Sequence, residues 1–240
     1  MKQYLAICFL LAFTVSTQRC STMKKMGLIP SELEMIMGLK DALSQGLFKS
    51  LDAFADPDGN PLVRFAFPGE AEKIERTLRD LGFDKTINQV TGKFTRAMSS
   101  AVRTAKPLFF DAIKSMSIKD AAKILVTDNP HAATDYFKGE MKPGLMTAFR
   151  PIVDSTIKVE GAEREWNGIT RIYNAIPFIN KPLENNLTDF IAARVIDLMF
   201  LLVANEEAQI RSKYELRKTD MMKKVFTWAE GELKRRLQKN

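Results

Sequence analysis

The chain has 240 residues, of which 45% are hydrophobic and 27% charged, so it is long enough for one large or two small domains of ordinary soluble composition. Its net charge of +7 arises from 36 basic and 29 acidic side chains. Because these charges are interleaved and no basic face or nucleic-acid motif stands out, the composition argues against a nucleic-acid-binding protein.

The N-terminus has the pattern of a secretory signal peptide over residues 1–17. Lys2 gives a short basic start, an apolar run of eleven residues follows over 5–15, and the small residues Ser16 and Thr17 offer cleavage points. Eleven apolar residues are too few to cross a bilayer, which takes about 20. The alternative is a weakly hydrophobic N-terminus that stays attached. We expect export, and therefore a secreted or extracellular protein, periplasmic in a bacterium.

Cysteine usage excludes an internal disulfide once such a signal peptide is removed. Cys8 would leave with it, so Cys20 would be the only cysteine of the mature chain. Cys20 could link two chains into a homo-oligomer or be inert. It is a poor lipoprotein acceptor, because Arg19 precedes it where a small residue is expected. We expect residues 18–29 to form a short, loose lead.

Helical periodicity begins at a capping box, in which Ser31 precedes Glu34 by three residues. Apolar residues then recur every three or four positions through Phe54, which predicts an amphipathic helix of about six turns. A cluster rich in proline and aspartate at 56–61 ends it. The stretch at 62–67, LVRFAF, is strand-like but has no partner strand of similar quality, so it predicts a short extended connector.

The remaining chain predicts further helices separated by short breaks. The first four are expected over 70–81, 85–104, 107–116 and 118–126, the last with Ser117 as cap and Asp120 in its first turn. Another follows Asn129, with Pro130 as its first residue, and the next starts at Pro143, with a kink or restart at Pro151. The last three are expected over 162–175, over 188–211 with Thr188 as cap, and from Thr219 onward. No repeat or long linker divides the chain. We therefore predict an all-α fold: a single multi-helix domain over residues 30–238, with about eight or nine helices and little or no β-sheet.

No stretch predicts a transmembrane span. The best candidate, 190–203, is interrupted by Arg194 and Asp197. Asp197 within this apolar helix is a candidate for an internal salt bridge, as is Glu160 with Arg164, although a solvent-facing stripe is the simpler interpretation of Asp197.

The common catalytic and metal-binding patterns are missing from the sequence. With a single histidine, His131, two-histidine and Cys–His zinc sites are excluded. There is neither a Gly-x-Ser-x-Gly elbow nor a glycine-rich phosphate loop. The best case for an enzyme rests on five polar side chains, at least two of which would have to share one polar cleft, namely Arg150, Glu163, Asn167, Asn174 and Asp197.

The stretch at 149–178 carries a family resemblance. It reads FRPIVDSTIKVEGAEREWNGITRIYNAIPF, with a Phe-Arg-Pro-Ile-Val start, Trp-Asn in the middle and Tyr-Asn-x-Ile-Pro-Phe at the end. It resembles a family of mostly bacterial exported proteins known as domain of unknown function number four thousand one hundred and ninety-seven. Matching segments, such as those at 60–64 and 105–109, extend the likeness over about residues 38 to 226. The resemblance implies an exported, all-helical domain; it transfers no reaction and no catalytic residue.

We hypothesise a secreted, non-enzymatic helical protein that binds an apolar small molecule, such as a lipid, a fatty acid or a carotenoid-like pigment. The chain lacks catalytic patterns and has 16 Phe and 12 Met, whose side chains line adaptable apolar pockets. No other cofactor is implied. The candidate ligand-binding residues, each of which could equally fill the core, are Phe149, Trp166, Ile169, Tyr173, Phe178, Phe190, Met199 and Phe200.

The alternative is an envelope or extracellular structural or interaction protein without a small-molecule ligand. Its support is the basic C-terminal end, where cations could touch an anionic membrane or a partner. A charged helix end is more often simply solvated. The cations concerned are Lys234, Arg235, Arg236 and Lys239.

Overall fold

Residues 29–67, 69–175 and 187–238 are described by the structure, a computed structural model. The predicted signal peptide, Cys20 and almost all of the lead lie outside these residues. Within them the chain forms eight α-helices, two 3₁₀ turns and no strand, which confirms the all-α prediction. The elements are α2 (Glu32–Ala55), η1 (Pro61–Val63), α3 (Gly69–Asp80), α4 (Asp84–Ser115), α5 (Ala121–Leu125), α6 (Ala132–Val159), α7 (Ala162–Asn174), α8 (Thr188–Ser212), η2 (Tyr214–Leu216) and α9 (Asp220–Leu237).

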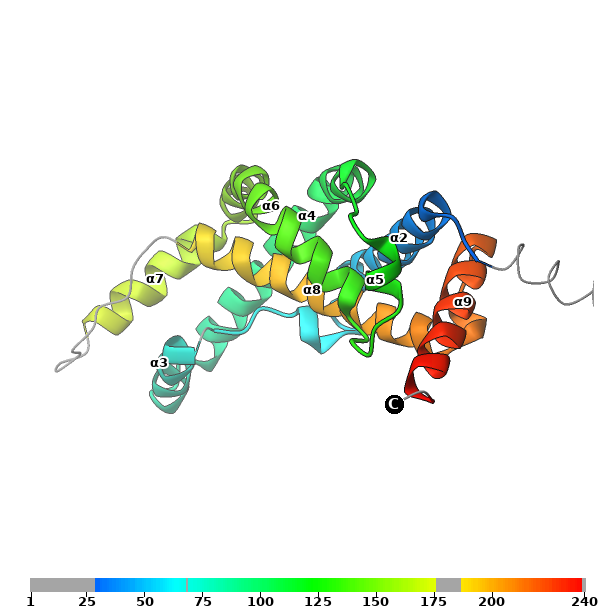
Figure 1. The fold of residues 1–240 in the computed structure, drawn as a ribbon. Helices are drawn as coiled ribbons and strands as arrows, with labels where there is room; N and C mark the ends of the chain where they lie inside the picture. Colours follow the sequence, from blue (N-terminus) through cyan, green and yellow to red (C-terminus); the bar gives the residue numbers. More distant parts are fainter. Residues whose placement is uncertain (1–28, 68, 176–186, 239–240) are drawn as a thin grey trace, which may run out of the picture.

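Helix α8 runs through the middle of the molecule (Figure 1). Helices α2 and α6 pack along it, and α4 packs on both of them. Helix α9 packs on α2 at one end, whereas α7 packs on α4 and α6 at the other (Figure 1). No helix within the described ranges is long and apolar enough to cross a membrane.

Two predicted helix starts are confirmed by their hydrogen bonds. The Ser31 hydroxyl accepts from the Glu34 amide at 3.3 Å, and the Glu34 carboxylate accepts from the Ser31 amide at 2.8 Å. At the last helix, the Thr219 hydroxyl accepts from the Met222 amide at 3.1 Å. These caps act within a few residues, so the local sequence is sufficient to specify them.

A ridge of small residues lets α2 approach its neighbours closely. Gly38, Ala42, Gly46 and Ser50 recur every four residues and are all buried. A Cβ atom on Gly46 would lie 3.1 Å from the Cα of Val203 in α8 and 3.2 Å from its carbonyl oxygen. Since the obstacle is backbone, a larger residue there would have to push the two helices apart.

We expect Gly46→Ala to lower the free energy of unfolding by about 1–3 kcal/mol through overpacking. Gly139→Ala is the matched control, because Gly139 is an exposed residue inside α6 and a Cβ there would meet no atom within 4 Å. It should raise stability by up to about 1 kcal/mol through helix propensity. Urea denaturation would measure both. A gain in stability from both substitutions would contradict the close approach of α2 and α8.

Three prolines lie inside helices that were predicted to break at them. Pro107 is within α4, so the helices predicted over 85–104 and 107–116 are one helix. Pro143 and Pro151 are within α6, which neither starts at Pro143 nor restarts at Pro151. All three prolines are exposed, and so are the residues four positions earlier. The carbonyls that lose a hydrogen bond therefore lie on the solvent side, which limits the energetic cost of each proline. Packing of the opposite, buried face keeps both helices continuous.

The short helix α5 was predicted too long and with the wrong cap. It spans five residues and begins after Asp120, whose φ of 53° is left-handed, so Ser117 is not its cap and Asp120 does not lie within its first turn. The first amide of α5, that of Ala121, donates to the carboxylate of Glu32 at 3.0 Å. The start of α5 is thus held by a residue 89 positions away, which local sequence patterns do not reveal.

A buried carboxylate from α8 caps α6. Helix α6 begins at Ala132, not at Pro130 as predicted, and the Asn129 side chain instead accepts from the His131 amide in the preceding turn. Glu207, which is 1% exposed, accepts from the Ala133 and Thr134 amides at 2.9 and 2.8 Å. Two amides at the start of α6 are thereby satisfied by a negative charge, which the helix dipole also favours.

Two arginines complete this junction. Arg211 donates to Glu207 at 2.8 Å and to the last two carbonyls of α5 at 3.0 Å. Arg217, only 2% exposed, donates to the carbonyls of Ile210 and Arg211 at 3.0 and 2.9 Å. Both guanidinium groups therefore bind carbonyls at helix C-termini, where the unpaired oxygens need donors.

Candidate functional site

The strand-like stretch at 62–67 contributes to a cluster of aromatic rings. It forms no strand; it passes from η1 into an extended connector that buries Val63, Phe65 and Phe67 and exposes the residues between them. The Phe65 ring lies 4.7 Å from Phe94, 5.2 Å from Phe67 and 6.3 Å from Phe190. The members of this aromatic cluster are Phe65, Phe67, Phe94, Trp166 and Phe190.

Trp166 connects the aromatic cluster to an open cleft. Its ring lies 6.0 Å from Phe67 and 6.2 Å from Phe94, within the range for aromatic pairs. The cleft has a volume of about 360 Å³ and lies where α4, α6, α7 and the start of α8 meet. We call it the Trp166 cleft. Its apolar lining is Phe94, Ile157, Trp166 and Leu187, and its polar lining is Asp154, Lys158, Glu163, Thr188 and Asp189.

Carboxylates outnumber cations in the lining of the Trp166 cleft. Lys158 donates to Asp154 at 2.8 Å, and this hydrogen bond holds the pKa of the lysine above its ordinary value. Arg150 pairs with Asp189 at 2.6 Å from just outside the lining. Glu163 adds a third carboxylate. The electrostatics therefore favour a ligand whose polar end is neutral or cationic.

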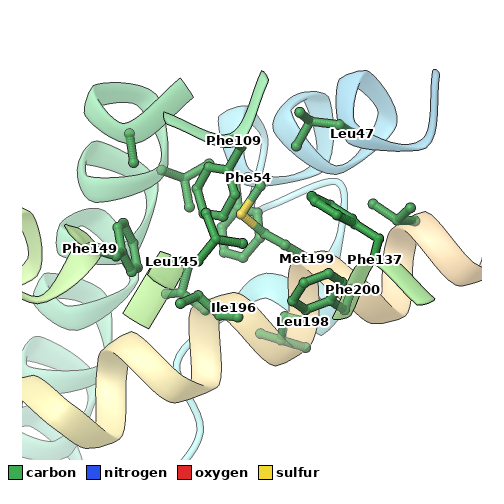
Figure 2. Packing of buried hydrophobic residues seen from close by; sticks show 14 of the residues in the cluster. Leu47, Phe54, Phe109, Phe137, Leu145, Phe149, Ile196, Leu198, Met199 and Phe200 are labelled. Atoms are coloured by element: carbon green, nitrogen blue, oxygen red, sulfur yellow. The ribbon is translucent and has the colours of Figure 1, made fainter. Parts of the chain in front are cut away.

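Three of the predicted ligand-binding residues fill the core instead of lining this cleft. Phe149 is fully buried, with its ring 5.8 Å from Phe109, and Phe200 packs 5.3 Å from Phe137. Met199 lies beside them, between α2, α6 and α8 (Figure 2). The helical period correctly predicted that these residues face inward. They face a junction of several helices, where neighbouring side chains occupy the space.

The other described candidates belong to α7 or to the start of α8, two of the helices that line the cleft. Trp166 lines it, and Phe190 belongs to the aromatic cluster. Ile169 is buried in α7 and Tyr173 packs on the core from the same helix. Phe178 lies outside the described residues. Among the seven described candidates, Trp166 alone lines the Trp166 cleft.

Most of the lining of the Trp166 cleft is not recognisable in the sequence. Phe94 and Ile157 are buried helical residues with no local mark of a site. Ile157 follows Phe149 by eight positions, on the same helix face, and this spacing was the one available signal. Whether such a residue lies in the core or in the wall of the cleft depends on the position of α7, which no pattern in the sequence predicts.

Of the five polar side chains on which an enzyme would rest, Glu163 alone lines the Trp166 cleft, so this cleft does not hold two of them. Arg150 approaches it only through Asp189. Asn174 is exposed at the end of α7. Among the residues that the structure describes, no group of three His, Cys, Asp or Glu side chains is placed to hold a metal ion.

The predicted pairing of Glu160 with Arg164 is replaced by contacts to α4. Glu160 accepts from the Ser100 hydroxyl at 3.0 Å and lies 3.8 Å from Arg96. Glu160 follows the last residue of α6, and at this position its carboxylate faces Ser100 and Arg96 on α4 instead of Arg164. His131, at the start of α6, places its Nδ1 3.0 Å from the Ala204 carbonyl oxygen, which is a structural contact.

Asp197 forms a half-exposed ion pair between helices. It bonds to Lys142 at 2.7 Å and Lys138 at 3.2 Å, both on α6. Partial burial raises the pKa of Asp197, but the hydrogen bonds from the two lysines outweigh it, so the net pKa lies below the ordinary value of 3.8.

We expect Asp197→Asn to lower the free energy of unfolding near neutral pH by less than about 1 kcal/mol, because the side chains are 32–45% exposed. Since the folded-state pKa is depressed, this contribution is fully present above the unfolded pKa of about 3.9 and is lost as pH falls through the folded pKa. Denaturation curves of both proteins at several pH values would measure it. If the two proteins still differed in their free energy of unfolding in strong acid, the ion pair would not be the cause of the difference.

Comparison with known proteins gives one result. The model of a family described as a protein of unknown function, DUF4197, matches residues 30–227. No curated protein and no solved structure matches the chain. The matched region runs from just before α2 into α9 and so includes the whole Trp166 cleft. The chain therefore belongs to the DUF4197 family of proteins of unknown function.

Proposed function

We propose that the protein is an exported, non-enzymatic binding protein whose ligand is an apolar small molecule seated in the Trp166 cleft. The observation that carries this proposal is the position of Trp166, whose ring is backed by Phe67 and Phe94 and lines a cleft of about 360 Å³. The lining has four apolar and five polar residues, so an aromatic wall is combined with groups that can orient a ligand, as in small-molecule sites. The volume is at the lower end for such sites, so it suits a small ligand or one part of a long one.

The charges at the cleft narrow the ligand class. Asp154, Glu163 and Asp189 contribute three carboxylates, against the cations of Lys158 and Arg150. An ionised fatty acid would bring a further negative charge to this edge, which is unfavourable. A neutral lipid or a carotenoid-like pigment has the apolar body without that charge. We therefore favour a ligand with a neutral or cationic polar end.

A single-tryptophan variant tests this directly. The chain has two Trp residues, so Trp228→Phe leaves Trp166 as the only tryptophan. Its fluorescence would be followed during titration with oleyl alcohol, oleylamine and oleate, which share one chain and differ in head group. We expect saturable changes with the alcohol and the amine and weaker binding of oleate. Glu163→Gln should reduce the ratio between the affinities for oleylamine and for oleate by roughly twofold to fivefold, as expected for an exposed charge.

The complementary variant, Trp166→Phe, keeps Trp228 and serves as the control, because Trp228 lies on α9 and not in the cleft. Its emission should not change in the titrations with oleyl alcohol and oleylamine. Equal responses of the two tryptophans to these two compounds, or no saturable response from Trp166 with any of the three compounds, would refute the proposed site.

An independent test is to purify the protein from its source, record its absorption spectrum and analyse an organic extract by mass spectrometry. We expect an apolar compound in stoichiometric amount. A colourless extract without such a compound would count against a resident ligand.

A further inference from the structure

A second groove, on α9, has a different chemistry from the Trp166 cleft. It has a volume of about 450 Å³ and combines two aromatic residues with three cations. Its lining is Tyr214, Lys223, Lys224, Thr227, Trp228, Gly231 and Arg235, with no carboxylate among these residues. We call it the α9 groove. It lies on the helix drawn in red in Figure 1, at the opposite end of the molecule from α7.

The helical period of α9 builds this groove. Lys224, Trp228, Gly231 and Arg235 follow one another at spacings of four, three and four residues, so they lie on one helix face. A Cβ atom on Gly231 would meet no atom within 4 Å, so the face is open at that point. The opposite face of α9 is buried against the rest of the protein, which leaves the groove pointing outward.

Two of the three cations of the α9 groove, Lys223 and Arg235, are only loosely engaged. Lys223 pairs with Asp220 at 3.1 Å and Arg235 with Glu232 at 2.8 Å, each within one turn of α9. Lys224 pairs with Glu34 of α2 at 2.6 Å. These lysine and arginine side chains are 40–63% exposed, and exposed pairs contribute little to stability. Lys223 and Arg235 can therefore turn toward an external anion at small cost, whereas Lys224 would first have to leave Glu34, whose side chain is 30% exposed.

Positive charge is concentrated in this part of the chain. Residues 213–238 contain eight basic and four acidic side chains, a net charge of +4 out of +7 for the whole protein. The aromatic residues sit among these charges. Tyr214 is 57% exposed, while Trp228 is partly buried against the core and so is held in place. Trp and Tyr rings beside Lys and Arg are typical of the interface between lipid head groups and hydrocarbon.

We propose that the α9 groove docks on the surface of an anionic lipid bilayer. Charge complementarity selects this occupant: lipid phosphates would meet Lys223, Lys224 and Arg235, while Trp228 and Tyr214 enter the head-group layer. The lysine stems can lie along the protein surface beside the two rings, with their ammonium groups at the phosphates. This inference does not depend on a ligand in the Trp166 cleft, which lies on other helices.

Vesicle flotation with the full chain tests the docking. Binding should be strong to vesicles of phosphatidylcholine mixed with phosphatidylglycerol and weak to phosphatidylcholine alone, and salt should weaken it. Lys223→Gln/Arg235→Gln should reduce the affinity for the mixed vesicles about 30-fold, from the usual contribution of each cation near an anionic surface. The control Arg76→Gln/Arg103→Gln removes the same amount of charge from exposed positions on α3 and α4. It should change the affinity for the mixed vesicles less than about twofold.

Equal losses in the two double variants would overturn the proposal, because net charge and not the groove would then be responsible. Binding that is equal for both kinds of vesicle, or absent for both, would overturn it as well. Soluble polyglutamate should compete poorly; competition as strong as that of the vesicles would make the groove a general polyanion surface, against the proposal.

A second measurement locates the contact. In Trp166→Phe, the emission of Trp228 should shift to the blue on mixed vesicles and be quenched by brominated phosphatidylcholine within them. Trp166 in Trp228→Phe should be unaffected. Quenching of Trp166 but not of Trp228 would place a different face on the membrane and refute the docking surface. Because these readouts concern α9 alone, their failure is distinguishable from failure of the cleft titrations.

Discussion

Glu207→Ala is expected to lower the free energy of unfolding by about 3–5 kcal/mol, because it leaves Arg211 without its buried partner. The same substitution removes the acceptor for two amides at the start of α6 and for the Thr134 hydroxyl, which lies 2.7 Å from the carboxylate. Each buried donor left unsatisfied adds to the loss. Chemical denaturation followed by circular dichroism would measure it.

Two variants separate this cause from a general effect of removing glutamate. Glu140→Ala removes an exposed carboxylate from α6 and should change stability by no more than about 0.5 kcal/mol. Glu207→Gln/Arg211→Met removes both buried charges and should be more stable than Glu207→Ala, since no charge is left uncompensated. A Glu207→Ala protein within about 1 kcal/mol of the wild type would mean that this junction does not hold α5, α6 and α8 together.

Phe149→Ala is expected to lower the free energy of unfolding by about 3–5 kcal/mol, the usual range for deleting a buried phenyl ring. Phe149 is fully buried, and its ring packs against Phe109 across the contact between α6 and α4 (Figure 2). The affinity of the Trp166 cleft for oleyl alcohol should be the same in Phe149→Ala as in the wild type, because Phe149 does not line this cleft. Denaturation and the fluorescence titration give the two readouts.

Phe149→Leu provides the conservative comparison and should lose less than about 1.5 kcal/mol, because most of the volume is kept. Leu201→Ala tests a partly exposed apolar residue of α8 and should lose less than Phe149→Ala. A Phe149→Ala protein with unchanged stability but weakened ligand binding would restore the original hypothesis that Phe149 is part of a ligand wall.

The adjacent residues Glu206 and Glu207 illustrate where sequence analysis ends. Both are buried carboxylates, yet Glu207 is held by Arg211 and two helix amides, whereas Glu206 accepts from Gln45 at 2.7 Å. Their sequence context is the same, so periodicity does not distinguish them. The difference arises because one side chain points to the start of α6 and the other to α2.

The candidate site was predictable only in part for the same reason. Trp166 was recognisable as an inward aromatic residue of α7, and it does line the cleft. Phe149 and Met199 satisfied the same pattern but lie where three helices meet. A helical period states which way a side chain points relative to its own helix, and the neighbouring helix decides whether that direction leads to a cleft or to the core.

The sequence by itself determined the all-α class, the caps at Ser31 and Thr219, and most helix spans, because these depend on interactions over three or four residues. Tertiary structure alone decided that α4 and α6 continue through Pro107, Pro143 and Pro151. It also decided that α5 and α6 begin at distant carboxylates. Packing of a buried helix face and charges brought from other helices outweigh local preferences there, and they arise only when the helices assemble.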